Sequence, residues 1–213
     1  MPGGLPARPF LYPIVDAAAL GGRSVTEVVR ALAEGGARLA QLRAKGVADG
    51  ALLPLAREAT SAAREAGITL VVNDRADVAR LVGADGVHVG QDDLPPSACR
   101  AVLGTGALVG LSTHGPGQVE AGRGEPVDYL AVGPVFPTRT KRDPDPVVGL
   151  ALVRRARALW TGPLVAIGGI TPENARAVVE AGADGLAVVS AVLAHPDIAL
   201  AVRRFRRALG EPA

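Results

Sequence analysis

Gly83-Ala84-Asp85-Gly86-Val87-His88 is the stretch that decides the fold, because it joins the end of a helix to the start of a strand. A glycine at this point can adopt the left-handed conformation that stops a helix, and the apolar residues after it begin a strand. The pattern recurs as Glu34-Gly35-Gly36-Ala37-Arg38-Leu39, Glu65-Ala66-Gly67-Ile68-Thr69-Leu70 and Ala181-Gly182-Ala183-Asp184-Gly185-Leu186, with a degenerate copy at Gly124-Glu125-Pro126-Val127-Asp128-Tyr129. Repeated helix-to-strand joins predict alternating βα units.

Apolar runs and helical patterns alternate along the whole chain. The expected strands lie near residues 10–15, 38–43, 69–73, 86–89, 108–112, 128–132, 164–167 and 185–189. The expected helices lie near residues 25–34, 49–65, 76–82, 96–103, 116–122, 149–160, 172–181 and 196–208. This alternation in a chain of 213 residues predicts an α/β fold, a single (β/α)8 TIM barrel that forms one catalytic domain over residues 1–213. A doubly wound open sheet is the alternative.

Two of the expected helices have recognisable start signals. Ser24 or Thr26 can cap the first helix through its side-chain oxygen. Thr171 followed by Pro172 has the form of a cap followed by proline in the first turn. These residues therefore predict where two helices begin.

Composition restricts the class of protein. Hydrophobic residues make up 48% of the chain and aromatic residues only 3%, so we expect a core of Val, Leu, Ile and Ala, which suits parallel strands covered by helices. A net charge of +2 makes no case for a nucleic-acid partner. The single cysteine, Cys99, excludes an intramolecular disulfide and a cysteine metal cluster.

The sequence contains no obvious membrane or export segment. The longest uncharged stretch, residues 158–172, is interrupted by glycine and proline, and the apolar run near the N-terminus is interrupted by Pro13 and Asp16. We therefore predict a cytoplasmic protein without a membrane partner. The oligomeric state is not fixed by the sequence, which is compatible with a homodimer.

Lysine is rare in this chain. Only two of the 23 basic residues are lysines, Lys45 and Lys141, and each closes a short polar motif after an apolar run. An ammonium group is a compact charge that suits single phosphate oxygens, whereas a guanidinium is a broad planar fork. Lys141 also lies in the longest irregular stretch, residues 133–148, which we interpret as a mobile lid over the barrel mouth. The two lysines indicate an enzyme that acts on phosphorylated small molecules; surface lysines beside turns are the alternative.

Polar side chains follow nearly every expected strand, at the end where barrel enzymes carry their active groups. They are Gln41, Arg43, Lys45, Asn73, Asp74, Gln91, Asp92, Asp93, Ser112, Thr113, His114, Thr138, Thr140, Lys141 and Ser190. Asp74 and either Asp92 or Asp93 follow neighbouring strands, so two carboxylates can converge there, and such a pair with open positions suits Mg²⁺. Spacing alone does not decide between Asp92 and Asp93.

A second anion site is expected after the last two strands. Gly168-Gly169 and Ser190 occupy the usual place of the phosphate cradle in this fold, where backbone N–H groups bind the anion. Tight turns without a ligand are the alternative. Together with the carboxylates and lysines, this cradle fits two phosphorylated substrates, one of them a diphosphate.

These residues resemble one family closely. The matching stretches are Gln41-Leu42-Arg43-Ala44-Lys45, Val72-Asn73-Asp74-Arg75, Gly86-Val87-His88-Val89-Gly90-Gln91-Asp92-Asp93, Gly110-Leu111-Ser112-Thr113-His114, Gly133-Pro134-Val135-Phe136-Pro137-Thr138-Arg139-Thr140-Lys141, Ile167-Gly168-Gly169-Ile170 and Val189-Ser190-Ala191. They follow the order of the thiamine-phosphate synthase family over nearly the whole chain, and together they are highly specific.

The resemblance implies a transferase of thiamine biosynthesis on a TIM barrel, with Mg²⁺ as cofactor. It would join a hydroxymethylpyrimidine diphosphate to a thiazole phosphate and release diphosphate. The resemblance places the pyrimidine diphosphate on Gln41, Leu42, Arg43, Ala44, Lys45, Asn73, Ser112 and Lys141. It places the thiazole phosphate on Thr138, Arg139, Thr140, Gly169, Val189 and Ser190. It also assigns Mg²⁺ to Asp74 and Asp93, and so selects Asp93 over Asp92.

The mechanism that the resemblance implies is dissociative. The pyrimidine methylene loses diphosphate and becomes a cation, and the thiazole nitrogen attacks it without a general base. Arg43, Lys45, Lys141 and Ser112 would stabilise the leaving group. The alternatives are a thiazole tautomerase on the same barrel, a sugar-phosphate isomerase or epimerase, and a non-catalytic sensor of a phosphorylated ligand.

Overall fold

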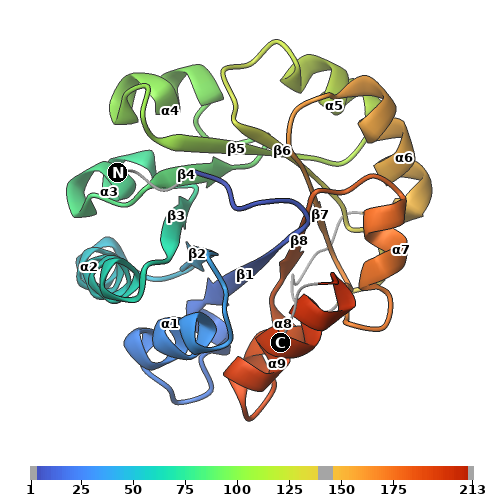
Figure 1. Ribbon diagram of the computed structural model, residues 1–213. Coiled ribbons are helices and arrows are strands. Elements are labelled where there is room, and N and C mark those ends of the chain that lie inside the picture. Colours follow the sequence, from blue (N-terminus) through green and yellow to red (C-terminus); the bar gives the residue numbers. More distant parts are fainter. Residues whose placement is uncertain (1–3, 139–145, 211–213) are drawn as a thin grey trace.

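The structure, a computed structural model, describes residues 4–138 and 146–210. Parallel strands form a closed barrel in which each strand pairs with the next in sequence and the last pairs with the first (Figure 1). The strands are β1 (Phe10–Asp16), β2 (Leu39–Arg43), β3 (Thr69–Asn73), β4 (Gly86–Val89), β5 (Leu108–Thr113), β6 (Tyr129–Val132), β7 (Leu164–Ile167) and β8 (Gly185–Val188). The predicted TIM barrel is confirmed, and the open sheet is excluded because β1 and β8 are paired.

Helices surround the barrel as an outer ring (Figure 1). They are the 3-10 helix η1 (Ala17–Ala19) and the α-helices α1 (Val25–Glu34), α2 (Asp49–Ala66), α3 (Ala76–Val82), α4 (Pro96–Leu103), α5 (Pro116–Gly122), α6 (Gly149–Leu159), α7 (Ala175–Glu180), α8 (Ser190–Leu193) and α9 (Ile198–Ala208). The glycine stops of the four regular copies are confirmed, because positive φ angles occur at Gly36, Gly67, Gly83 and Gly182. The degenerate copy differs, because Arg123, which follows α5, has the right-handed conformation and Gly124 has no positive φ. No helix within the described ranges has the length and apolar character needed to cross a membrane.

One of the two predicted helix starts is correct. The Ser24 side chain caps α1 and forms a reciprocal capping box with Glu27. The prediction for Thr171 is wrong, because α7 begins only at Ala175. The Asn174 side chain accepts a hydrogen bond from the Thr171 backbone N–H at 2.9 Å, which holds residues 171–174 in a turn ahead of the helix. The short α8 was also absent from the prediction.

Two separate apolar cores follow from the alternation of side chains along each strand. The inner core fills the barrel and consists of Phe10, Tyr12, Ile14, Leu39, Val71, Leu108, Tyr129, Ala131, Val165 and Ala187. The outer core lies between the barrel and its helices and is built from Val, Leu, Ile and Ala with few larger residues. The aliphatic core expected from composition is therefore present, although two tyrosines and a phenylalanine lie inside the barrel.

The aspartate of the repeated Gly-Ala-Asp pattern has a structural role at the end of the barrel where the strands begin. Asp184 Oδ2 accepts the backbone N–H of Leu164 on the neighbouring strand at 2.9 Å. Asp85 and Asp128, which precede β4 and β6, bond the starts of β3 and β5 in the same way, at 2.8 and 2.7 Å. The pattern that ends one helix therefore also joins two strands, a role that the sequence alone did not reveal.

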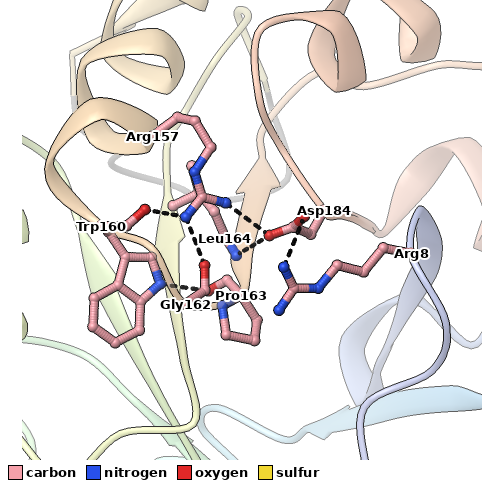
Figure 2. A network of polar contacts seen from close by, with 7 residues as sticks. All are labelled: Arg8, Arg157, Trp160, Gly162, Pro163, Leu164 and Asp184. Carbon is pink, nitrogen blue, oxygen red and sulfur yellow. Dashed lines mark hydrogen bonds and ion pairs between the residues drawn. The ribbon is translucent and has the colours of Figure 1, made fainter.

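An arginine from α6 completes the last of these junctions, as Figure 2 shows. Arg157 binds Asp184 at 2.9 Å and donates to the backbone carbonyls of Trp160 and Gly162, while Arg8 reaches the other Asp184 oxygen at 3.3 Å. Arg100 on α4 binds Asp128 in the same manner at 2.8 Å. These ion pairs fasten helices to strands at the end opposite the functional residues.

Candidate active site

A cavity of about 480 Å³ opens at the ends of the strands where they run into the following loops. The predicted site residues that line it are Gln41, Arg43, Lys45, Asn73, Asp74, Asp93, Ser112, Thr138, Gly169, Val189 and Ser190. They come from the ends of β2, β3 and β5 and from the residues that follow β2, β3, β4, β6, β7 and β8. The structure therefore brings the residues of both predicted anion sites into one cavity.

Two of the predicted residues do not present side chains to this cavity. Leu42 is buried in the outer core, and Ala44 packs against that core. Because side chains alternate along β2, Gln41 and Arg43 face inward while Leu42 faces the helices. Leu42 and Ala44 can therefore contact a substrate only through their backbone. Arg139, Thr140 and Lys141 lie outside the described residues, as does the central part of the predicted lid, residues 139–145.

Asp74 and Asp93 meet at the cavity rim. Asp93 lies close enough to Asp74 to raise the pKa of its carboxyl group, and Lys45 Nζ lies 3.2 Å from Asp74 Oδ2. Burial raises the pKa of Asp74, the contact with Asp93 raises it further, and the positive charge of Lys45 opposes both effects. Two carboxylates in contact repel each other unless a proton or a cation lies between them.

The backbone around these carboxylates holds them in place. Asp74 has a φ of 63°, which is uncommon for a residue other than glycine, and its N–H donates to the His88 carbonyl at 2.8 Å. Asp93 Oδ2 accepts the Gly90 N–H at 2.7 Å, which closes the loop after β4. Asp92 also lines the cavity, but it is exposed. The structure therefore pairs Asp74 with Asp93.

This pair fits a divalent ion of the magnesium type. It offers two carboxylates that repel each other when both are charged, and it faces an open cavity in which water and phosphate oxygens can complete the coordination shell. No cluster of three or more His, Cys, Asp or Glu side chains occurs in the described part of the chain. The donor set is thus too small and too rich in oxygen for a closed transition-metal site.

Arg43 is oriented by a carboxylate that the sequence analysis did not select. Asp16, at the end of β1, is buried and pairs with the Arg43 guanidinium, with which it is in register across the two strands. Asp16 also accepts the Ala18 N–H at 3.0 Å, which fixes its own position. Arg43 is therefore held at the cavity wall before any ligand binds. The sequence feature that could have identified Asp16 is its position as a carboxylate at the end of an otherwise apolar strand.

The predicted phosphate cradle lies on the other side of the barrel from β2 and β3. Gly168 and Gly169 both adopt positive φ angles, at 102° and 62°. A Cβ atom at position 169 would lie 2.6 Å from the Pro137 carbonyl oxygen, so only glycine fits. Val189 and Ser190 follow β8 and line the same part of the cavity. The glycines therefore allow residues 134–137 to pack directly against this turn. Gly168 and Gly169 also line the cavity, which is the position that a backbone phosphate site requires.

A chain of hydrogen bonds runs beneath the cavity, across the inside of the barrel. Gln41 Nε2 lies 3.0 Å from the Tyr12 hydroxyl, which lies 2.9 Å from the Tyr129 hydroxyl. His88 Nδ1 lies 3.0 Å from the Tyr129 hydroxyl, and His88 Nε2 lies 2.8 Å from Ser112 Oγ. Two predicted substrate-binding residues, Gln41 and Ser112, are therefore connected through three buried side chains.

Comparison with known proteins identifies the family. A family model described as "Thiamine monophosphate synthase" matches residues 11–192. The chain belongs to the thiamine monophosphate synthase family. A thiamine-phosphate synthase of Koribacter versatilis is 47% identical over 88% of this chain and 90% of the relative. Another, of Moorella thermoacetica, is 42% identical over 92% of this chain and 93% of the relative.

A solved structure of the same family supports the assignment. Thiamine phosphate pyrophosphorylase from Pyrococcus furiosus superposes with a TM-score of 0.84 at 33% identity and covers 95% of this chain and 96% of its own. The predicted transferase activity and the place in thiamine biosynthesis are thereby confirmed at the level of the thiamine monophosphate synthase family.

Proposed function

We propose that this chain joins 4-amino-2-methyl-5-(diphosphooxymethyl)pyrimidine to 4-methyl-5-(2-phosphooxyethyl)thiazole and releases diphosphate with thiamine phosphate. The observation that supports this most strongly is that residues of both predicted anion sites line one cavity. Arg43, Lys45 and the Asp74–Asp93 pair lie at one side, and Gly169 and Ser190 lie at the other. A condensation of two phosphorylated substrates needs such a cavity, whereas an isomerase needs only one such site.

The pyrimidine diphosphate would occupy the region next to β2, β3 and β5. Gln41 and Asn73 would orient it, and Arg43, Lys45 and Ser112 would bind its diphosphate. When Mg²⁺ is bound by Asp74 and Asp93, it would supply further positive charge to the diphosphate oxygens. Lys141 would act on the same group from a segment outside the described residues. These groups stabilise negative charge that grows on the leaving oxygen.

The reaction moves electrons but requires no proton transfer. The bond between the pyrimidine methylene carbon and the diphosphate oxygen breaks, and its electron pair leaves with the diphosphate. The thiazole nitrogen then uses its lone pair to form the new carbon–nitrogen bond. Burial lowers the pKa of His88 to about 4 and raises that of Tyr12 to about 12, so neither group is suited to act as a base near neutral pH. The site fits a reaction that needs none.

The thiazole phosphate would occupy the glycine-rich side, where Thr138, Gly169, Val189 and Ser190 line the cavity. The proposed roles of Arg139 and Thr140 fall on residues outside the described ranges. Replacing Ser190 with alanine removes one hydrogen-bond donor to the phosphate. We expect KM for the thiazole phosphate to rise about tenfold, since a hydrogen bond to a charged group contributes about 1.5 kcal/mol. Initial rates at varied concentrations of each substrate measure this. A rise in KM for the pyrimidine diphosphate alone would mean that Ser190 binds that substrate, and it would contradict the assignment of Ser190 to the thiazole phosphate.

Removal of divalent ions should abolish turnover. Without a cation, the Asp74 and Asp93 carboxylates repel both each other and the incoming diphosphate. We expect EDTA-treated, dialysed protein to be inactive, Mg²⁺ to restore full activity, and Ca²⁺ to restore less, because it prefers longer bonds and more ligands. The measurement is diphosphate release over a titration of each ion. Full activity in EDTA would reject the metal site.

The function is tested by an omission experiment. The protein is incubated with both substrates and Mg²⁺, and thiamine phosphate and diphosphate are quantified beside reactions that lack one component. We expect both products only in the complete reaction. Conversion of a thiazole phosphate without the pyrimidine would instead identify a tautomerase. Turnover of a sugar phosphate would identify an isomerase or epimerase, and binding of both substrates without any product would indicate a sensor.

A further inference from the structure

The hydrogen-bond chain lies at the floor of the cavity, and its three central members have little exposure to water. Tyr12, Tyr129 and His88 are buried, and no buried side-chain nitrogen or oxygen lacks a partner within the part of the chain that the structure describes. Their rings are also fixed against one another. The His88 and Tyr129 rings stack with centroids 5.4 Å apart, and the Tyr12 ring meets Tyr129 edge-on at 5.9 Å. This packing leaves the polar atoms little freedom to choose other partners.

Gly110 on β5 makes the close approach possible. A Cβ atom at this position would lie 2.1 Å from the Tyr129 ring and 2.5 Å from His88 Nδ1. Any larger residue would therefore separate the two rings. A second contact holds the backbone of Ser112, because Gln91 donates to the Ser112 carbonyl at 2.7 Å.

The direction in which each hydrogen bond of this chain is donated follows from Gln41, its first member. An amide nitrogen can only donate, so the Tyr12 oxygen accepts from Gln41 Nε2, and the Tyr12 proton is free for the Tyr129 oxygen. With Tyr12 as the donor to Tyr129, the Tyr129 proton points to His88 Nδ1, which then accepts. A neutral imidazole that accepts at one nitrogen carries its proton on the other, and so His88 Nε2 donates to Ser112 Oγ.

We propose that this one-way chain makes Ser112 an obligate hydrogen-bond donor to the leaving diphosphate, with Tyr12, Tyr129 and His88 as its positioning residues. The inference rests on the proposed function, because it concerns a group of that site. The Ser112 oxygen already accepts from the ring, so its own proton points to the substrate. A donor whose direction is fixed before the reaction needs no reorganisation as charge develops. If the Gln41 amide were turned over, every bond would reverse, and Ser112 would give its proton to His88 instead.

The arrangement requires a His88 ring with a single proton, which accepts at one nitrogen while it donates at the other. A charged imidazolium would donate at both nitrogens and would interrupt the chain at Tyr129.

Two histidine variants test whether His88 acts through Ser112. In His88→Gln the amide nitrogen can still donate to Ser112, whereas the shorter side chain of His88→Asn cannot reach it. We expect Ser112→Ala to lower kcat about a hundredfold and His88→Asn to lower it about tenfold, with KM for both substrates nearly unchanged. His88→Gln should keep most of the activity that His88→Asn loses. His88→Asn should cause no further loss in the Ser112→Ala protein. If His88→Asn caused the same loss in the wild-type and the Ser112→Ala proteins, its role would be merely structural, and the proposal would be overturned.

His195→Asn, in a loop after α8, is the matched control. If His88→Asn does not fold, Tyr129→Phe is compared in the same two backgrounds.

NMR of isotope-labelled histidine tests the direction of the chain without any substrate. We expect His88, assigned by its absence from the spectrum of His88→Gln, to carry its proton on Nε2 at neutral pH. A proton on Nδ1 would reverse the chain and overturn the proposal even if the enzyme makes thiamine phosphate. Conversely, a protein that forms no product but keeps the Nε2 proton would reject the proposed function and leave the direction of the chain intact.

Discussion

Replacing Asp93 with asparagine should lower kcat about a thousandfold while the protein stays folded. The substitution removes a negative charge from the Asp74–Asp93 pair, and with it the attraction for a divalent ion. The asparagine oxygen can still accept the Gly90 N–H that Asp93 binds at 2.7 Å, so the loop after β4 keeps its shape. Steady-state rates at saturating substrates and increasing Mg²⁺ measure the effect.

The neighbouring carboxylate provides the control for this prediction. Asp92→Asn removes the same charge one residue away, from an exposed side chain at the same rim. We expect little change in kcat and in the Mg²⁺ concentration that gives half-maximal rate. If Asp92→Asn abolished turnover and Asp93→Asn did not, the metal ligand would be Asp92.

Replacing Asp184 with alanine should reduce the free energy of unfolding by about 3 kcal/mol. The largely buried carboxylate balances the Arg157 guanidinium, whose side chain is only 27% exposed, and accepts the Leu164 N–H at 2.9 Å (Figure 2). Its removal leaves a partly buried cation and a backbone donor without their acceptor. Urea unfolding followed by circular dichroism measures the change.

An exposed ion pair is the control for the stability prediction. Glu65 pairs with Arg30 at 3.2 Å, but both side chains are about 60% exposed. Because water screens such a pair, Glu65→Ala should change the free energy of unfolding by less than about 1 kcal/mol. The Asp184 variant should also keep its kcat while folded, since Asp184 lies at the other end of the barrel. An equal effect of the two substitutions would show that the junction at Asp184 adds no special stability.

The barrel was predictable because its signals are local. Each glycine that ends a helix lies within a few residues of the next strand, so strand positions follow from short patterns. The errors concern the shortest helices. Residues 190–193 form a helix too short for a hydrophobic period to show in the sequence. Before α7, the contact between Asn174 and Thr171 favours a turn where the Thr-Pro pair indicated a cap.

The parts of the site that the sequence missed depend on contacts between distant segments. Tyr12 and Tyr129 are 117 residues apart in the chain and meet only because the barrel closes. Asp16 gains its role from its register with Arg43 on the next strand. The choice between Asp92 and Asp93 depended on a family resemblance, and the structure shows which of the two contacts Asp74.

The central claim is that one barrel mouth binds a divalent ion and a diphosphate together. Anomalous scattering from crystals soaked with Mn²⁺ and diphosphate tests it most directly, since Mn²⁺ accepts the same oxygen ligands as Mg²⁺. We predict a metal peak at the carboxylates of Asp74 and Asp93, with diphosphate oxygen bound to it and to Arg43 or Lys45. A metal bound elsewhere, or diphosphate bound away from these residues, would contradict the account.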